Sequence, residues 1–151
     1  MTTERHKNIV ASYLLLIRDG KILLSRRTGT GYEDGKYGMV AGHVEQGESC
    51  TQCMIREARE EVGIELQSED LQVVHVMHRN EPQKIDDERM DVFFTVTKWQ
   101  GTIENKEPEK CDDLAWFDLG QLPANTIVYI LQAISLAQKK VLYSEHGWIQ
   151  T

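Results

Sequence analysis

Residues 42–64 read GHVEQGESCTQCMIREAREEVGI and combine a run of glutamates with a helical repeat. At about 100° per residue, Glu57, Glu60 and Glu61 share a patch about 100° wide over roughly one helical turn. An apolar stripe adjoins this patch and is made of four residues: Met54, Ile55, Ala58 and Val62. The spacing therefore predicts an amphipathic helix that packs on a core and carries three carboxylates along one side.

The predicted helix has recognisable ends. Ser49 followed three residues later by Gln52 is a capping-box pattern, and Gly63 is the glycine expected after the last turn. Several carboxylates on one helical face repel each other unless positive charge lies among them. A hard divalent cation, Mg²⁺ or Mn²⁺, is a natural partner because such ions take oxygen ligands. The alternative is an ordinary surface helix whose glutamates pair with Arg56 and Arg59.

The order of glycines and charged residues resembles one known signature. From Gly42, five residues lead to Glu48, and seven more lead to Arg-Glu-Ala-Arg-Glu-Glu-Val-Gly-Ile at residues 56–64. This order matches, without a mismatch, the box of the Nudix hydrolases, G-x5-E-x7-R-E-U-x-E-E-x-G-U, in which U is a bulky aliphatic residue in most members. Ala58 is a small but common occupant of the first U position. The resemblance implies an α/β/α sandwich with a central mixed β-sheet, and hydrolysis of a nucleoside diphosphate linked to another group with a divalent cation.

The resemblance also assigns roles within the box. We expect Glu57 and Glu61, which stack one helical turn apart, to bind the cation directly. Glu60 is either a third ligand or the general base that deprotonates the attacking water. The carbonyl of Gly42 is expected as a backbone ligand, because glycine lets the chain approach an ion closely. Glu57, Glu60 and Glu61 are therefore the predicted catalytic residues.

Residues around this set are expected to support it. Glu48 is predicted to pair with Arg56 and to hold the preceding loop against the helix. Direct or water-mediated contact of Glu48 with the cation is the alternative. Nudix enzymes also recruit an acid from a loop late in the sheet. In this chain the candidate is Glu109, within residues 107–113, as an extra metal ligand or base.

Two further residues are predicted to contact substrate phosphates. Arg26 and Arg27 end a predicted strand, where Nudix enzymes often place an arginine on the substrate phosphates. Successive strand residues point to opposite faces, so at most one of the two should reach the site, and Arg27 is favoured. A solvated strand end is the alternative. His43 follows Gly42 directly and could touch a phosphate. Three aromatic residues could stack on a base, although core packing is the favoured interpretation for each: Tyr37, Trp116 and Tyr129.

The rest of the chain predicts strands around this helix and a second helix near the end. Residues 8–17 and 22–27 form a predicted hairpin about Asp19-Gly20. The glycine-rich residues 28–38 are expected to form a loop. Short strands are predicted at residues 39–41, 71–78, 90–99 and 114–117, and the second helix at residues 126–140. This pattern predicts an α+β fold with a mixed sheet between helices.

Length, charge and cysteine content limit the classes of protein to which this chain can belong. At 151 residues the chain is expected to form a single domain, residues 1–151. A net charge of −7 argues against a basic surface, so no nucleic acid is expected as a partner. No apolar run approaches the roughly 20 residues of a membrane span, so no membrane partner is expected. Three cysteines, with Cys50 and Cys53 expected as small helix residues, indicate reduced thiols and a cytoplasmic protein.

The predicted substrate is a small-molecule nucleotide. The chain most resembles MutT-like nucleoside triphosphate pyrophosphohydrolases, which release pyrophosphate and leave a monophosphate, in some cases from oxidised nucleotides. Residues 37–43, YGMVAGH, depart from many members, which have Trp and Pro-Gly-Gly there, so nucleotide sugars, ADP-ribose and dinucleotides stay as alternatives. A non-catalytic nucleotide-binding module is the alternative from another class. Residues 143–148 carry two aromatic side chains and could form an interface in a homodimer or cover the core.

Overall fold

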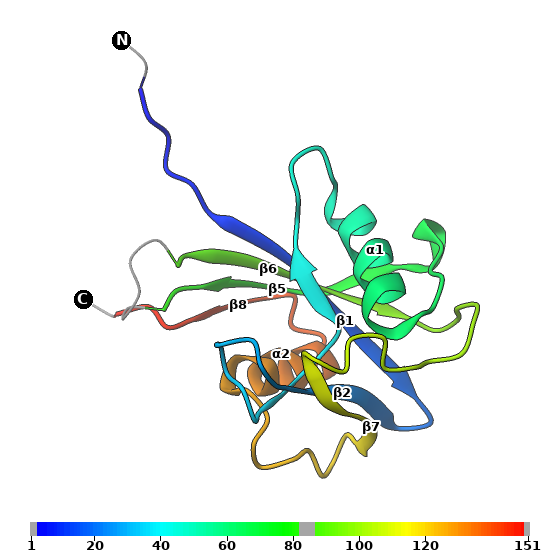
Figure 1. Cartoon of the computed structure of the whole chain (residues 1–151). Helices are drawn as coiled ribbons and strands as arrows, with labels where there is room; N and C mark the ends of the chain where they lie inside the picture. Colours follow the sequence, from blue (N-terminus) through cyan, green and yellow to red (C-terminus); the bar gives the residue numbers. More distant parts are fainter. Residues whose placement is uncertain (1–2, 82–86, 150–151) are drawn as a thin grey trace.

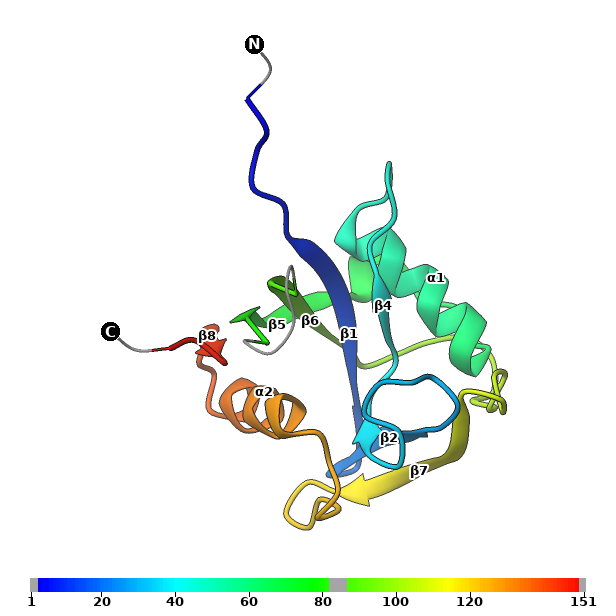
Figure 2. The ribbon, with the colours of Figure 1, turned by 60° about the vertical axis from the view of Figure 1, so that its left-hand side comes forward.

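Helix α1 (Cys50–Val62) and helix α2 (Val128–Gln138) lie on opposite sides of a mixed β-sheet (Figures 1 and 2). The computed structural model describes residues 3–81 and 87–149. The strands are β1 (Ile9–Arg18), β2 (Lys21–Arg27), β3 (Tyr37–Gly38), β4 (Ala41–His43), β5 (Gln72–Arg79), β6 (Arg89–Val96), β7 (Cys111–Asp118) and β8 (Tyr143–His146). A short 3₁₀ helix spans Ser68–Asp70. Within the described ranges, no helix has the length and apolar character that a membrane crossing needs. The predicted α+β fold with a central mixed sheet is confirmed.

Strand β1 lies at the centre of the sheet. The strands run in the order β3-β2-β1-β6-β5-β8, while β4 pairs with β1 and β7 pairs with β2. The β1–β6 and β5–β8 pairs are parallel, and the β1–β4, β2–β7 and β5–β6 pairs are antiparallel. Because a helix covers each side of the sheet, the two faces of β1 belong to two separate cores.

Alternating side chains of β1 supply those cores. Ala11, Tyr13 and Leu15 pack on the side of α2, whereas Leu14 and Leu16 pack on the side of α1. The predicted apolar stripe of α1 lies in the second core, where three of its members are buried and one is partly buried: Met54, Ala58, Val62 and Ile55. The stripe therefore sets which side of α1 faces inward and leaves its acidic side at the edge of the core.

The predicted hairpin between β1 and β2 is present. Asp19 and Gly20 have φ angles of 54° and 74°, as in a type I′ turn. β1 pairs with β2 at Ile17 and Arg18, next to this turn. The earlier part of β1 pairs with β4 and β6, while β2 pairs along its length with β7. β2 and β4 thus pair with different parts of β1. The chain segment that connects β2 to β4 can therefore border a cavity.

The predicted strand at residues 39–41 is wrong in its bounds. The strand is β4, in which Gly42 pairs with Ser12. Met39 and Val40 are buried but lie between strands, because the apolar character of this run reflects burial and not strand pairing. The predicted loop at residues 28–38 is likewise too long, since its last two residues form β3 and pair with β2. Gly42 therefore lies within a strand and not after one.

Residues 143–146 form β8, a strand that the sequence did not predict. β8 pairs in parallel with β5 at the edge of the sheet. The indole N–H of Trp148 donates to the carbonyl of His78 at 2.8 Å. Tyr143 and Trp148 remain 49% and 39% exposed. This segment extends the sheet, and His146 also meets the core residue Tyr129, with 6.3 Å between ring centroids.

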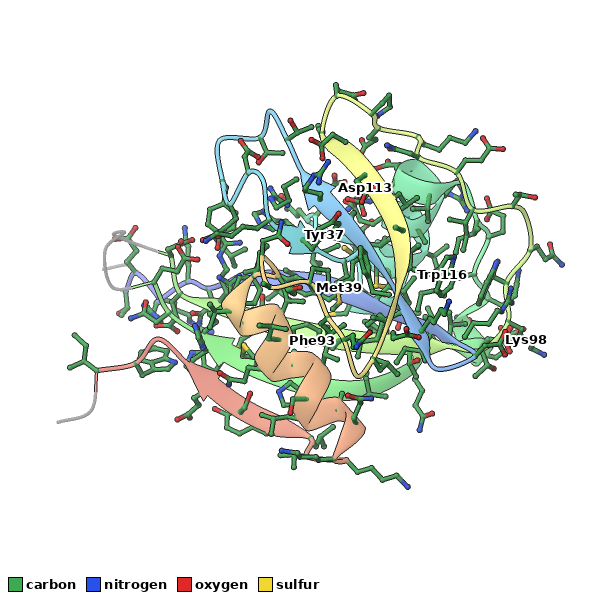
Figure 3. The ribbon with its side chains drawn as sticks, turned by 90° about the horizontal axis from the view of Figure 1, so that it is seen from below. Tyr37, Met39, Phe93, Lys98, Asp113 and Trp116 are labelled. Carbon is green, nitrogen blue, oxygen red and sulfur yellow. The ribbon has the colours of Figure 1, made fainter. Side chains whose placement is uncertain are left out.

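Tyr37 and Trp116 pack within the protein. Tyr37 lies edge-on to Phe117, with 5.0 Å between ring centroids, and its hydroxyl donates to Asp113 (Figure 3). Trp116 packs against the core beside α1. For these two aromatic residues the favoured core interpretation agrees with the structure.

Candidate active site

A cavity of about 620 Å³ reaches from α1, past β4, to the start of α2. Its volume is typical of small-molecule sites. Next to α1 and β4 lies what we call the acidic end, made of Gly42, Glu57, Glu60 and Glu61. On the α2 side of the sheet lies what we call the tyrosine end, made of Tyr13, Tyr32 and Tyr129. The cavity therefore joins two chemically different surfaces.

Helix α1 begins and ends where the sequence predicts. The Ser49 hydroxyl accepts the N–H of Gln52 at 3.1 Å, and the Gln52 side chain accepts the N–H of Ser49 at 2.8 Å. Gly63 has a φ of 73°, and its N–H donates to the carbonyl of Arg59 at 3.1 Å. With its ends set and its apolar stripe in the core, α1 presents its glutamates to the cavity.

Gly42 is in direct contact with Glu57. A Cβ added at Gly42 would lie 2.1 Å from Oε1 of Glu57, far inside any allowed contact. The carbonyl of Gly42 is 3.5 Å from the Sγ of Cys53, whose thiol donates to it, so this carbonyl faces α1. Only glycine allows the backbone of β4 to lie this close to the carboxylate. The predicted juxtaposition of Gly42 and Glu57 is therefore present.

Arg56 connects the acids of the box. Its Nε and Nη2 donate to the two carboxylate oxygens of Glu48 at 2.7 and 3.0 Å, a bidentate pair. Its Nη1 donates to Glu57 at 2.7 Å and to Glu60 at 3.3 Å. Its Nη2 also donates to the carbonyl of His43 at 3.2 Å. The expected Glu48–Arg56 pair is present, and it lowers the pKa of Glu48 to about 2.

The surroundings of Glu57 and Glu61 in the folded protein disfavour the charged forms of both carboxylates. Burial raises the pKa of Glu57, and the guanidinium of Arg56 opposes this rise. Burial also raises the pKa of Glu61, and the negative charge of Glu57 raises it further. The N–H of Ala41 donates to Oε2 of Glu61 at 2.9 Å, which partly offsets both effects. A cation placed beside these two carboxylates would stabilise their charged forms.

The acids border one cavity without converging on one point. Within residues 3–81 and 87–149, no three acidic, histidine or cysteine side chains are close enough together to hold a metal ion. Arg56 holds Glu57, Glu61 turns towards Ala41, and the side chain of Glu60 is 52% exposed. The donor set still fits a hard divalent cation, since it consists of carboxylates beside a backbone carbonyl that no Cβ shields.

Arg27 borders the cavity and Arg26 does not. Nε of Arg27 donates to the carbonyl of Tyr32 at 2.7 Å, and its Nη2 donates to Thr30 at 3.1 Å. Arg26 points to the other face of β2 and pairs with Asp112 at 2.7 Å. This alternation agrees with the expectation that one arginine of the pair reaches the site. Its contact with a phosphate stays a prediction.

His43 also borders the cavity, where it meets an arginine that the sequence did not single out. Nη1 of Arg89 lies 3.0 Å from Nε2 of His43, so this nitrogen accepts and the ring is neutral. Burial and the charge of Arg89 both lower the pKa of His43. Arg89 is the first residue of β6, so its place at the cavity depends on strand pairing and left no signal in a single sequence.

The loop before β7 supplies a different acid from the one predicted. Glu109 is exposed and does not border the cavity, whereas Glu107 does. The carbonyl of Glu107 accepts the N–H groups of Lys110 and Cys111, both at 2.9 Å, in a turn that leaves Glu107 on the inner side. The charge of Glu107 raises the pKa of both Glu57 and Glu61. Glu109 therefore does not reach the cavity and Glu107 does, because loop sequence does not reveal which side chain a turn points inward; a ligand or base role for Glu107 is a prediction.

The tyrosine end was largely missed. Tyr129, which is 8% exposed, borders the cavity as well as packing in the core beside α2. Tyr13 and Tyr32 were not singled out, because Tyr13 lies in an apolar strand and Tyr32 in a glycine-rich loop. Their meeting at one place depends on contacts between distant parts of the chain.

Comparison with known proteins identifies related chains. The sequence profile of the NUDIX domain matches residues 6–135. Proteins described as NAD-capped RNA hydrolase NudC are similar over much of this chain, from Pseudomonas aeruginosa at 34% identity over 110 residues and from Stutzerimonas stutzeri at 29% over 126 residues. These matches cover 73% and 80% of this chain but 36% and 41% of those proteins. The chain thus spans less than half the length of these relatives.

Solved structures share the fold. The MutT NUDIX hydrolase from Burkholderia pseudomallei is similar with a TM-score of 0.78 and 25% identity, over 85% of this chain and 97% of that one. The ORF135 protein of E. coli is similar with a TM-score of 0.67 and 27% identity, over 87% of this chain and 91% of that one. Both likenesses extend over nearly the whole of the solved chains.

Proposed function

The chain belongs to the Nudix family of hydrolases, and from this premise we propose that it hydrolyses a phosphoanhydride bond of a nucleotide with Mg²⁺ or Mn²⁺ as cofactor. The observation that carries the proposal is the contact between Gly42 and Glu57, with Glu60 and Glu61 beside them on one cavity wall. Such a set of oxygen donors next to a cavity of nucleotide size suits phosphoryl transfer.

Three groups would hold the cation: the carboxylates of Glu57 and Glu61 and the carbonyl of Gly42. When bound, a divalent cation supplies charge that neutralises phosphate oxygens and lowers the pKa of water. The raised pKa values of Glu57 and Glu61 support this assignment, because burial is their main cause and a cation beside the carboxylates would offset it. Arg56 keeps Glu48 and the preceding loop in place and holds Glu57 at the cavity wall.

Glu60 is the favoured general base among the box residues. Its side chain is 52% exposed and borders the cavity, so it can accept a proton from a water there. Glu107 is the second candidate, since it borders the same space from the opposite loop. A third ligand role for Glu60 remains the alternative.

Two arginines and a histidine would meet the phosphates. Arg27 and Arg89 border the cavity from β2 and β6, and each carries N–H groups on a rigid fork that suits phosphate oxygens. His43 lies between Arg89 and the acidic end. We propose that these side chains orient the phosphate chain so that the attacked phosphorus lies at the acidic end.

The proposed substrate is a nucleoside triphosphate, which is cleaved to the monophosphate and pyrophosphate; oxidised nucleotides are included. The MutT-like character of the sequence supports this choice, as does the likeness to a MutT NUDIX hydrolase over 97% of that chain. A dinucleotide or a capped RNA end is the second candidate. It is favoured by the 29–34% identity to proteins described as NAD-capped RNA hydrolases, although the matches cover only 36% and 41% of those proteins.

A substrate panel tests the proposal. Purified protein with Mg²⁺ is incubated with the four common nucleoside triphosphates, an oxidised triphosphate, UDP-glucose, ADP-ribose, NADH, a diadenosine polyphosphate and a NAD-capped RNA. Products are separated and identified as pyrophosphate, phosphate or monophosphate. We expect triphosphates to be cleaved fastest, with pyrophosphate as product. Glu57→Gln is the matched variant and should lower kcat by orders of magnitude while the circular dichroism spectrum is unchanged.

Two outcomes would contradict parts of the proposal. Faster cleavage of NADH or NAD-capped RNA would replace the triphosphate by the second candidate. No cleavage of any compound, together with nucleotide binding that survives Glu57→Gln, would favour a non-catalytic binding module. Activity that persists in EDTA would remove the cation from the proposal.

We also propose a cytoplasmic location and a homodimer. All three cysteines are free thiols, which suits a cytoplasmic protein. A homodimer would use the edge strand β8 and its neighbours, where Leu142, Tyr143 and Ile149 are 60%, 49% and 77% exposed. Light scattering at several concentrations gives the oligomeric state directly.

A further inference from the structure

The chain segment before β7 brings one more carboxylate, that of Glu107, next to the acidic end. The side chain of Glu107 is 27% exposed and borders the cavity, whereas Glu109 is exposed and does not border it. A loop has no regular repeat that sets the direction of its side chains, so contacts with other residues decide which acid faces inward. Residues 104–111 make three sets of such contacts.

The side chain of Asn105 joins the two ends of the turn that carries Glu107. Its Oδ1 accepts the N–H of Glu107 at 3.1 Å, which is the arrangement of an Asx turn. Its Nδ2 donates to the carbonyl of Cys111, the first residue of β7, at 2.7 Å. Asn105 is exposed, so both bonds compete with water and contribute little net stability. Their main consequence is local, because they fix the backbone on both sides of Glu107.

The backbone beside Asn105 is bonded to the end of α1. The N–H of Glu104 donates to the carbonyl of Val62, and the N–H of Lys106 donates to the carbonyl of Glu61, both at 3.0 Å. The last carbonyls of a helix have no partner within the helix, so these bonds satisfy them. In Figures 1 and 2 the segment before β7 passes the end of α1. The segment is thus attached to the residue that supplies one carboxylate of the acidic end.

The other side of the turn lies against the loop after β2. The N–H of Thr28 donates to the carbonyl of Lys110 at 3.0 Å. A Cβ added at Gly29 would lie 2.9 Å from the carbonyl oxygen of Glu109, so these two backbones are in close contact. The turn is therefore held between α1 and the loop after β2. Within this frame, the side-chain amide of Asn105 is the group that bonds to the backbone N–H of Glu107.

The carboxylate of Glu107 adds negative charge close to the proposed cation ligands. Its charge raises the pKa of Glu57 and of Glu61, so it lies within electrostatic reach of both. Nζ of Lys110 is 3.8 Å from Oε2 of Glu107, and the Lys110 side chain is 61% exposed, so this pair is weak. A divalent cation at the acidic end would be a stronger partner for Glu107 than Lys110 is.

We propose that Asn105 is the positioning residue for Glu107: its amide holds the turn that directs this carboxylate to the acidic end, where the carboxylate strengthens cation binding. The inference rests on the proposed function, since that function places a divalent cation at the acidic end. Asn105 also borders the cavity, but its side-chain amide is occupied by the turn. The effect of Asn105 on cation binding therefore passes through Glu107.

A thermodynamic cycle on metal binding tests this inference without turnover. The wild type, Asn105→Ala, Glu107→Gln and the double variant are titrated with Mn²⁺ by calorimetry in the absence of nucleotide. We expect Glu107→Gln to weaken Mn²⁺ binding about 10-fold and Asn105→Ala about 5-fold, since loss of groups that support a metal site typically costs about 10–100-fold. The double variant should bind Mn²⁺ as Glu107→Gln does, within about 2-fold, because Asn105 then has no carboxylate to position.

A conservative variant and a control separate positioning from general loop stability. In Asn105→Ser the hydroxyl can accept the N–H of Glu107 but is too short to reach the carbonyl of Cys111, so Mn²⁺ affinity should recover part of the way. Asn125→Ala removes a side-chain bond of similar length, from Nδ2 to the carbonyl of Gly35 at 2.9 Å, in another exposed loop. It should leave Mn²⁺ affinity unchanged. Thermal midpoints of all variants are measured alongside.

The outcomes distinguish this inference from the proposed function. If the cycle shows the expected coupling while no nucleotide is hydrolysed, the catalytic proposal fails and the positioning role of Asn105 stands. If nucleotides are hydrolysed but the two losses of Mn²⁺ affinity add in the double variant, the proposed function stands and the positioning role is wrong. Unchanged Mn²⁺ affinity in Asn105→Ala with a raised KM would also overturn the inference, because Asn105 would then contact the substrate directly.

Discussion

The two ends of the cavity are built in opposite ways. The acidic end comes from residues 42–64, where a strand, a capped helix and a terminal glycine follow one another along the chain. The tyrosine end comes from β1, the loop after β2 and α2, joined by one buried arginine from β5. The first end is a product of helical geometry, and the second is a product of packing between distant segments.

The two ends of the cavity also differ in how their buried charged side chains are stabilised. At the acidic end, burial and repulsion raise the pKa values of Glu57 and Glu61, so their charged forms are disfavoured in the folded protein. At the tyrosine end, Arg79 is buried but is matched by Asp91 and by the tyrosine rings. Charge that burial disfavours is common at catalytic sites, whereas paired charge is common in rigid parts of a fold; at the tyrosine end the pairing is incomplete, because Oδ1 of Asp91 is buried without a hydrogen-bond partner among the described residues. We therefore expect substitutions at the acidic end to change kcat or metal affinity, and substitutions at the tyrosine end to change KM.

The largest effect is expected from Gly42→Ala. The new Cβ would displace the carboxylate of Glu57 at the point where the two touch. Because a shift of about 1 Å at a catalytic group can cost about 100-fold, we expect kcat to fall at least that far on every substrate, with or without a base. Gly120→Ala is the control, since a Cβ there meets nothing within 4 Å. An unchanged kcat in Gly42→Ala would show that the close approach has no catalytic importance.

Arg56→Gln should have the next largest effect. It removes the cation that holds Glu48, Glu57 and Glu60 together, and loss of a residue that orients ligands typically costs about 10–100-fold in metal affinity or activity. The Mg²⁺ dependence of kcat gives the apparent metal affinity. Arg59→Gln alters the same helix on its exposed side, where the arginine pairs with Glu65, and should leave that affinity unchanged. Equal effects of the two changes would mean that Arg56 has no special role.

Substitution of Tyr32 should have a smaller effect on KM, and this effect should depend on the substrate. Tyr32→Leu should raise KM about 5–10-fold for nucleotides and leave base-free triphosphates unaffected, because it removes ring surface from one end only. Tyr32→Phe should retain most of the binding, since the ring stays and the lost hydroxyl bonds to Arg79 and Glu81 within the protein. Steady-state kinetics on both kinds of substrate measure the contrast. A loss of kcat on base-free compounds would place Tyr32 at the acidic end instead.

The smallest effect is on stability, from Glu61→Gln in the metal-free protein. The pKa of Glu61 is raised on folding from its ordinary value of 4.5, so ionisation at neutral pH disfavours the folded state. Below pH 4.5 the group is protonated in both states and this penalty is absent. The variant should therefore be more stable than the wild type at pH 7.5, with Tm higher by about 2–4 °C for each kcal/mol recovered, and the gain should vanish towards pH 4.

Thermal unfolding in EDTA at a series of pH values measures this difference. Glu60→Gln is the control, because it removes a carboxylate from the same helix at a side chain that is 52% exposed. A Glu61→Gln variant that is less stable than the wild type at pH 7.5 would show that the ionised carboxylate is already satisfied without a cation.

Local periodicity and capping were enough to locate α1, its ends and its buried stripe, because these depend on residues within a few positions of each other. The resemblance to the Nudix box placed Gly42 beside the glutamates and, together with strand alternation, favoured Arg27, which lies on the cavity side of β2. It also located the hairpin turn at Asp19-Gly20. In each case the relevant geometry repeats over a short stretch of backbone.

Other features required distant segments to meet. Glu107 and not Glu109 faces the cavity because of a turn whose direction no short pattern encodes. Arg89 and Tyr32 reach the cavity through strand pairing and loop packing, and β8 forms because β5 offers it an edge. Arg79 looks like an ordinary strand-end arginine until folding encloses it among Tyr13, Tyr32 and Tyr129. Side-chain direction outside regular elements is set by these contacts, so it emerges with the folded chain and not from the order of residues.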